Sequence, residues 1–393
     1  MTLASVARTT KAFWNGTHRV RVPEETWDII RPMLGRFGIT RVADVTGLDA
    51  IGIPVVMAVR PLAKLLAVSQ GKGQTLTLAA VSGAMESIEM WHAENAVPAA
   101  SHPRTPAREL PLPYALRDVV TVPGGLLTTD TPLDWVDAVG LHSGRTVPVP
   151  VPLVAIPAPH EQSWLPRGLQ SGSNGLASGN CREEAALHAL YEVIERDVLS
   201  RPDLDIARID LNPRTVTGDT CGELLDRLYA ADATVRIFHV PNRYGVPCFG
   251  VSVWTDDFPV IADGWGAHLA PGIALSRALT EAAQSRLTSI VGSREDVPAL
   301  YEHVRRGSTN PLPPPDEPTS WAELDHGHDH DFTDVADELG RVSAMVAEVA
   351  GAEPLLVDLS TDDAVAVVRV VLPGATIDVD RFHPKTPSNA SPP

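Results

Sequence analysis

The stretch SNGLASGNCREEAALHALYEVIERD, residues 173–197, decides how the rest of the sequence is interpreted. It begins as a turn rich in Gly, Ser and Asn and continues with the apolar spacing of a helix. Residues three or four apart share one helix face. The polar stripe of this helix is therefore formed by Asn180, Glu184, His188, Glu192 and Glu195.

A second stretch, GKGQTLTLAAVSGAMESIE at residues 71–89, has the same order of glycine turn, helix and Glu-x-x-Glu. Glu86 and Glu89 correspond to Glu192 and Glu195, and Ser82 lies one turn before Glu86. One Glu-x-x-Glu is common in helices, but two copies in matching contexts indicate related units. Like charges at this spacing disfavour a helix. Neither helix has the lysines that usually offset them, which favours a cation site.

Mg²⁺ is the natural cation because it prefers carboxylate oxygens and shares its shell with nucleotide phosphates. The alternative is a pair of solvated acidic helix faces. Asn180 also has an alternative, since Asn180-x-x-Glu183 has the form of a capping box at a helix start. A cap and a ligand contact are compatible with each other.

A third helix, predicted over residues 272–291, contains Arg277, Glu281 and Arg286. Arg277 and Glu281 are one turn apart, so they form either an ordinary intrahelical ion pair or an arginine clamp on phosphate beside a metal carboxylate. Lys72, in the GKG turn, is a candidate phosphate contact or simply a solvated lysine. That turn lacks the spacing of a P-loop, and no G-x-G-x-x-G follows a strand.

The composition is that of a globular protein, with 393 residues, 44% hydrophobic and 21% charged. A formal net charge of −17 argues against nucleic acid as a partner. Three scattered cysteines form no CxxC, and the start has no apolar signal segment, so we expect a cytoplasmic protein. The most apolar run, residues 147–159, is interrupted by prolines and predicts no membrane helix.

The pattern of elements predicts a mixed α/β fold in which related glycine-turn and helix units pack on sheets. We expect a helix over residues 23–34 and buried strands at 52–61, 234–242, 248–255 and 364–372. The proline-rich stretch 97–113 predicts an extended surface connection. The HGHDHD run at 326–331 predicts a flexible loop, with chelation of a metal as the alternative.

With these residues assembled, the sequence resembles the YcaO family, enzymes that use ATP to activate backbone amides of ribosomally made peptides. Three motifs carry the resemblance: SGAMESIE at 82–89, the stretch at 173–197, and SRALTEAAQSR at 276–286. The resemblance covers residues 65–375 and implies a catalytic ATP-binding domain there. The element pattern predicts an N-terminal α/β segment at 1–64, and the polar, proline-rich composition predicts a mobile tail at 376–393.

The resemblance also implies roles for these residues, with ATP and Mg²⁺ as cofactors. The implied metal ligands are Glu86, Glu89, Glu192, Glu195 and Glu281. The implied nucleotide contacts are Ser82, Asn180, Glu184, Arg196 and Arg277, and Lys72 and Arg286 are further candidates. No general base is evident.

The N-terminal stretches NGTHR (15–19), 38–55 and VSQGKG (68–73) resemble the branch that works with TfuA-type partners and is associated with thioamide formation. The end, TPSNASPP, departs from the Pro-x-Pro-x-Pro tail of many azoline-forming members. We therefore expect thioamidation of a precursor peptide or protein with a TfuA-like partner. The alternatives are an azoline-forming cyclodehydratase and a non-catalytic peptide-binding subunit. The oligomeric state stays open, with a homodimer as one candidate.

Overall fold

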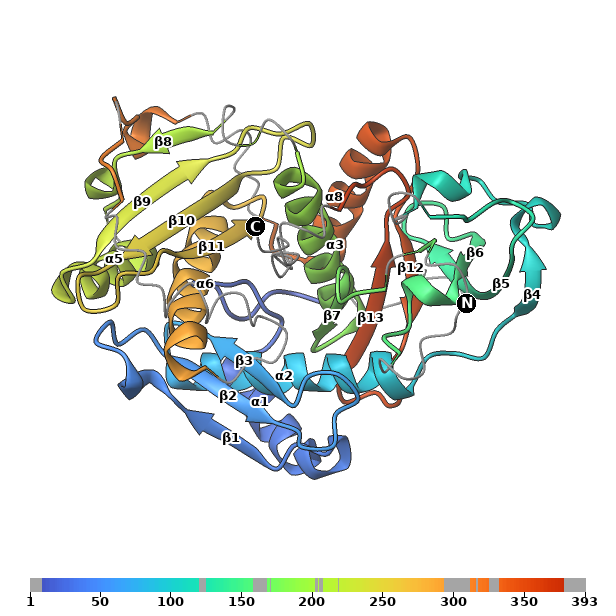
Figure 1. Cartoon of the computed structure of the whole chain (residues 1–393), viewed down its shortest axis with the longest axis horizontal. Helices are drawn as coiled ribbons and strands as arrows, with labels where there is room; N and C mark the ends of the chain where they lie inside the picture. The colour runs from blue at the N-terminus through green and yellow to red at the C-terminus, as the bar shows by residue number, and fades with distance from the viewer. Residues whose placement is uncertain are drawn as a thin grey trace, which may run out of the picture.

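The structure is a computed structural model of the chain. It describes residues 9–119, 125–157, 168–169, 171–201, 204, 208–217, 219–292, 312–315, 317–324 and 332–377. Helices and antiparallel sheets alternate along the chain, which confirms the predicted mixed α/β fold (Figure 1). The predicted tail and the HGHDHD run lie outside the described residues, apart from the tail's first two residues.

The first sheet is three-stranded and packs against helix α2 (Leu76–Asn95), and helix α1 (Pro23–Ile30) packs on α2. Its strands are, in order across the sheet, β1 (Arg41–Asp44), β2 (Val55–Val59) and β3 (Val68–Lys72). Helix α2 begins where the Thr75 hydroxyl accepts a hydrogen bond from the backbone N–H of Leu78, at 3.2 Å. The predicted boundary at residue 64 falls between β2 and β3, so this sheet contains both predicted segments.

The second sheet is four-stranded, and helices α5 (Asp219–Ala230) and α6 (Pro271–Val291) pack on it. Its strands are, in order, β11 (Ala262–Ala267), β10 (Cys248–Trp254), β9 (Thr234–His239) and β8 (Ile209–Leu211). Helix α6 has Pro271 at its first position and ends at Gly292, whose φ of 67° is left-handed.

The third sheet packs against helix α3 (Arg182–Leu199) through β7 and β13, and helix α8 (Val335–Ala350) packs on α3. Its strands are β4 (His102–Pro106), β5 (Pro132–Gly140), β12 (Leu355–Asp358), β13 (Ala366–Val371) and β7 (Leu176–Gly179), with β6 (Thr146–Pro150) paired to β5. The prediction for 97–113 was wrong in part, because His102–Pro106 forms β4. This is an edge strand, a position where prolines are tolerated.

Three strand-and-helix units, β3–α2, β7–α3 and β11–α6, are packed on one another, because each helix contacts the strand of another unit: α2 contacts β7, α3 contacts β11 and α6 contacts β3 (Figure 1). Glycines allow the close approach of strand and helix. A Cβ on Gly71 would lie 2.0 Å from the Ala79 carbonyl oxygen, and one on Gly264 would lie 2.2 Å from that of Ala278. The predicted related units are therefore confirmed, and β11–α6 is a third one.

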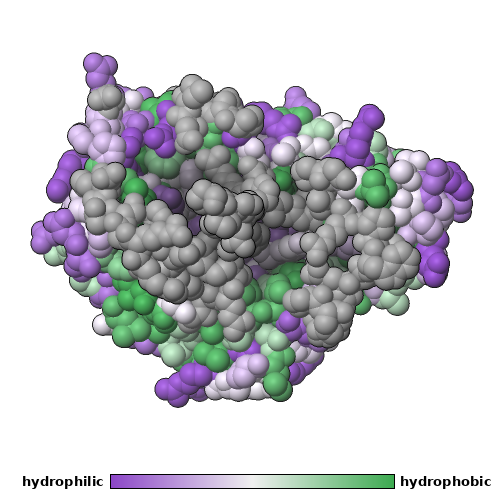
Figure 2. Space-filling view, viewed as in Figure 1, coloured by the Kyte–Doolittle hydropathy of each residue, from purple (hydrophilic) through white to green (hydrophobic). Residues whose placement is uncertain are grey.

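Hydrophilic side chains dominate the rim of the face drawn in Figure 2, and hydrophobic ones gather at its lower left. The exposed large hydrophobic residues include Leu48 and Leu62, which lie in connections of the first sheet and are 59% and 95% exposed. Among the helices that the structure describes, none combines the length and hydrophobicity that a bilayer span requires.

Candidate functional site

Helices α2 and α3 place their Glu-x-x-Glu carboxylates close together. Glu89 Oε1 accepts hydrogen bonds from the backbone N–H and hydroxyl of Ser178, at 2.8 and 2.5 Å. The pKa of Glu89 is raised to about 8, chiefly by burial and also by the negative charges of Glu86 and Glu192, although the Ser178 hydrogen bonds oppose the rise. The two Glu-x-x-Glu copies therefore form a single acidic cluster.

Helix α6 adds a further carboxylate to this cluster. Burial raises the pKa of Glu195, only 5% exposed, to about 7, and Glu281 is the strongest neighbouring charge that raises it. Burial also raises the pKa of Glu192, against the attraction of Arg196. The alternative of solvated acidic faces is therefore wrong for the clustered carboxylates.

Two cations accompany these carboxylates. Lys72 forms an ion pair with Glu281, so it is not a simply solvated lysine. Burial alone would raise the pKa of Glu281, but Lys72, Arg196 and Arg277 together outweigh it and hold this pKa below its ordinary value. Burial disfavours the charge on Arg196, whereas Glu192 and Glu195 more than compensate and raise its pKa.

Arg277 connects α6 to α3. Its Nη1 lies 3.2 Å from Nδ1 of His188, while Glu281 pairs with Lys72. The alternative of an Arg277–Glu281 ion pair within the helix is therefore wrong. Burial and then the charge of Arg277 hold the pKa of His188 well below its ordinary value, so this imidazole is neutral and Nδ1 accepts the bond from Arg277.

The start of α3 holds Asn180 and Glu184 in one hydrogen-bonded group. Asn180 donates to Glu184 Oε1 from its backbone N–H and from Nδ2, at 3.1 and 2.9 Å. Its Oδ1 accepts from the Thr26 hydroxyl at 2.8 Å. The N-cap residue is Cys181, so the cap alternative for Asn180 is wrong.

In the part of the chain that the structure describes, the two remaining predicted residues, Ser82 and Arg286, form no hydrogen bond or ion pair with the carboxylates of the acidic cluster. Ser82 is half-buried on α2, one turn before Glu86. Arg286 is 1% exposed, and its Nε contacts both carboxylate oxygens of Asp49, at 2.9 and 3.0 Å. Its other nitrogens bond to Thr255 and Asp257. In the structure, Arg286 therefore forms ion pairs and hydrogen bonds within the protein, whereas the sequence predicted a phosphate contact.

The sequence did not predict that two further arginines, Arg19 and Arg369, belong to the site. Arg19 approaches Glu184 at 3.8 Å, and its nearby charges include Arg277 and Glu89. Arg369 is 3% exposed on β13, and burial lowers its pKa to about 10 against the attraction of Glu192. A lone arginine in the apolar run AVAVVRVVL was the signal that could have identified Arg369.

These residues fit Mg²⁺ and a phosphate-bearing nucleotide. The carboxylates are hard oxygen donors, and the raised pKa values of Glu89 and Glu195 show that the protein alone does not compensate the charge of their ionised forms. Arg369 Nη1 is buried and has no hydrogen-bond partner among the described residues. A divalent cation would balance the carboxylates, and a phosphate oxygen would suit a buried guanidinium of this kind.

Comparison with known proteins agrees with this geometry. Residues 70–376 match the family described as YcaO cyclodehydratase, ATP- and Mg²⁺-binding. A YcaO from Methanopyrus kandleri, solved with AMPPCP and Mg²⁺ bound, is 25% identical, with a TM-score of 0.71 over 98% of this chain and 100% of that one.

Two relatives match most of the sequence. An uncharacterized protein of Mycobacterium tuberculosis is 36% identical over 384 residues, covering 95% of this chain and 86% of the relative. An uncharacterized protein in the tfuA 3′ region of Rhizobium leguminosarum bv. trifolii is 32% identical over 391 residues, covering 92% and 89%.

The chain belongs to the YcaO family, as its motifs indicated. It is an ATP-dependent peptide-modifying enzyme of this family, and its cofactors are ATP and Mg²⁺, which confirms the cofactor prediction.

Proposed function

We propose that this enzyme converts a backbone amide of a peptide or protein into a thioamide, with a TfuA-type partner. The observation that carries the proposal is the relative in the tfuA 3′ region, which is similar over 92% of this chain. The acidic and arginine cluster supports the ATP-dependent part, because phosphoryl transfer is catalysed chiefly by positioning and by neutralising phosphate charge.

An amide carbonyl resists nucleophiles, and its oxygen is a poor leaving group. In the proposed reaction sulfide adds to the carbonyl carbon, and the oxygen departs as phosphate after taking the terminal phosphoryl group of ATP. ATP supplies the phosphoryl group, and Mg²⁺ neutralises phosphate charge when bound. The protein positions the nucleotide and the amide and excludes water.

We assign the metal ligands to the acidic cluster: Glu86, Glu89, Glu192, Glu195 and Glu281. The proposed nucleotide contacts are Lys72, Ser82, Asn180, Glu184, Arg196 and Arg277. Arg369 joins them as a candidate phosphate contact because its buried Nη1 has no partner among the described residues. Arg286 is left out, because Asp49 and Asp257 already bind its guanidinium.

Two other functions compete with this one. The family's description as a cyclodehydratase favours azoline formation, in which a Cys, Ser or Thr side chain of the peptide is the nucleophile. A non-catalytic subunit that only binds peptide is disfavoured by the intact acidic cluster and its arginines. We also propose that the enzyme acts in the cytoplasm, which its three free cysteines fit, and that a homodimer is one candidate for its oligomeric state.

Intact-mass analysis distinguishes the two reactions. The enzyme is incubated with a precursor peptide encoded near its gene, with ATP, Mg²⁺, sulfide and any TfuA-like partner encoded nearby. Thioamidation exchanges oxygen for sulfur and raises the peptide mass, whereas azoline formation removes water and lowers it. A gain that requires sulfide supports the proposal. A loss that needs no sulfide and disappears when a precursor Cys or Ser becomes Ala contradicts it.

A further inference from the structure

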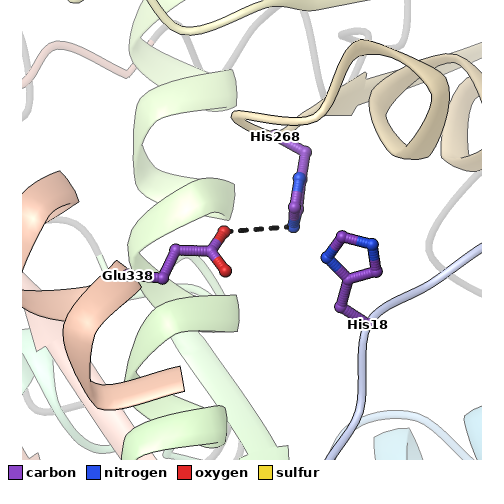
Figure 3. A group of neighbouring side chains, drawn as sticks. All are labelled: His18, His268 and Glu338. Atoms are coloured by element: carbon purple, nitrogen blue, oxygen red, sulfur yellow. Dashed lines mark ion pairs between the residues drawn. The ribbon is translucent and has the colours of Figure 1, made fainter. Parts of the chain in front are cut away.

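A second buried polar cluster is centred on Glu338 of helix α8. Oε2 of this carboxylate accepts a hydrogen bond from Lys11 Nζ, and Oε1 accepts one from the Tyr191 hydroxyl at 2.5 Å. His268 Nε2 lies 3.4 Å from Oε1 (Figure 3). The side chains of Lys11 and Glu338 are each only 1% exposed, so this is a buried and neutralised ion pair.

His18, His268 and Glu338 lie close enough to suggest a metal site, but the hydrogen bonds contradict this. The backbone N–H of Ala270 donates to His268 Nδ1 at 2.9 Å, so the ring proton of neutral His268 is on Nε2, facing Glu338. A metal-bound histidine has the opposite arrangement, with a lone pair toward the metal and its other N–H donated outward. The ammonium of Lys11 is the cation of this cluster.

The same reasoning fixes the proton of His18. The Lys11 ammonium can only donate, and it lies 3.2 Å from His18 Nδ1, so Nδ1 accepts and Nε2 carries the hydrogen. Burial and then the charge of Lys11 lower the pKa of His18 to about 4, which keeps the ring neutral at physiological pH. Figure 3 shows one ring nitrogen of His18 turned toward Glu338 and the other turned away.

Neighbouring rings hold His18 in this orientation. Its centroid lies 4.5 Å from that of Trp14 and 5.2 Å from that of His268, both in edge-to-face geometry. His18 therefore presents a fixed N–H donor on the side away from Lys11.

The two residues that follow His18 contact Glu184, one of the proposed nucleotide contacts. Arg19 approaches this carboxylate at 3.8 Å, and the backbone N–H of Val20 donates to its Oε2 at 2.8 Å. The charge of Arg277 acts on Glu192 and Glu195 of the acidic cluster and also on Tyr191 and His268 of the second cluster. Arg277 therefore lies within electrostatic range of both clusters, and the segment around His18 touches both the second cluster and a proposed nucleotide contact.

We propose that His18 Nε2–H donates a hydrogen bond to the carbonyl oxygen of the peptide amide that the enzyme activates. This role rests on the proposed function. Negative charge develops on that oxygen when the nucleophile adds, and a preorganised donor stabilises it. A neutral imidazole is suited to this task because it donates without transferring its proton. Lys11 is a positioning residue, since its bond to Nδ1 keeps the hydrogen on Nε2.

Two substitutions separate the two nitrogens of His18. His18→Gln places an amide nitrogen near the position of Nε2, so a donor remains but the acceptor for Lys11 is lost. His18→Asn keeps an acceptor near Nδ1 and loses the donor at Nε2. We expect kcat with peptide to fall about 10²–10³-fold in His18→Asn and about tenfold less in His18→Gln, with Mg²⁺-ATP affinity unchanged. Thermal stability should show the opposite order, with the Asn variant more stable.

The opposite orders make the role testable. An activity that follows stability, or an Asn variant as active as the wild type, would overturn the role of His18 and leave the proposed function intact. A wild-type enzyme that modifies no peptide would overturn the proposed function itself, and the role with it. His102→Gln on β4, whose side chain is 40% exposed, is the control for the replacement of a histidine and should keep full activity.

Discussion

The acidic cluster differs from the second cluster, formed by Lys11, His18, Tyr191, His268 and Glu338 and called the Lys11 cluster below, in how its buried charge is balanced. In the acidic cluster, the pKa of Glu89 reaches about 8 because burial and like charges are not balanced by cations. In the Lys11 cluster, Glu338 has an ammonium and a hydroxyl on its two oxygens. Unbalanced buried charge costs stability and marks a place for a ligand of opposite charge. Balanced charge fixes the geometry of its neighbours.

Glu195→Gln should have the largest effect, because it removes a proposed metal-ligand charge at nearly constant volume. Turnover of peptide and ATP should fall by several orders of magnitude. The melting temperature of the metal-free protein should hold or rise, because the repulsion between Glu195 and Glu281 is relieved. Steady-state kinetics and thermal melts measure the two quantities.

Glu223→Gln on α5 is the matched control, since this glutamate is exposed and outside the cluster. It should change neither quantity. An active Glu195→Gln enzyme would show that the acidic cluster does not hold the catalytic metal.

The difference between the two clusters also explains what could be predicted from the sequence. Glu86 and Glu89 share one helix, as do Glu192 and Glu195, so helical periodicity alone placed them on common faces. Lys11, His18, His268 and Glu338 come from separate segments that meet only in the folded chain. No local pattern could bring them together.

The same limit applies to single residues. Arg286 follows Arg277 and Glu281 on the same helix, so its position in the sequence was compatible with a phosphate contact. Only the folded chain brings Asp49 and Asp257 to its guanidinium. Helix α8 and strand β5 were not predicted at all, although the helix has a clear start at Asp334, whose side chain accepts from the backbone N–H of Ala336 at 2.9 Å. The strand was missed because short apolar runs near prolines resemble loops.

Lys11→Met should have the next largest effect, which is a loss of stability of the folded protein. It leaves the Glu338 carboxylate buried without its cation, which typically costs about 3–5 kcal/mol of unfolding free energy. Adding Glu338→Gln removes the unpaired charge and should restore part of the loss. Denaturant unfolding of the single and double variants measures the non-additivity.

Mg²⁺-ATP affinity is the second readout of these variants, because the Lys11 cluster is not expected to hold the metal. We expect the affinity of the folded double variant to stay near that of the wild type. If the double variant is no more stable than Lys11→Met alone, the charges of Lys11 and Glu338 do not balance each other. A large loss of Mg²⁺-ATP affinity would place Lys11 in the acidic site.

The smallest expected effect is the pH dependence of Mg²⁺ binding. The pKa values of Glu89 and Glu195 are raised to about 8 and about 7, so both carboxyls retain protons near neutral pH and must release them to bind a metal. Affinity should therefore rise roughly tenfold or more between about pH 6 and 8.5. A carboxyl whose pKa is raised in the folded state also favours folding less as the pH rises. The contribution of Glu89 to the stability of the metal-free protein should therefore fall from pH 4.5, the ordinary pKa of a glutamate, up to about pH 8. His18 acts in the opposite direction on stability: its folded-state pKa of about 4 lies below its ordinary value of 6.5, so its contribution to stability rises with pH between these two values.

Calorimetry in two buffers of different ionisation enthalpy counts the protons released, and Glu195→Gln should release fewer than the wild type. A flat affinity with no proton release would mean that the carboxylates of the acidic cluster are already balanced, as Glu338 is, and that the contrast between the two clusters does not hold.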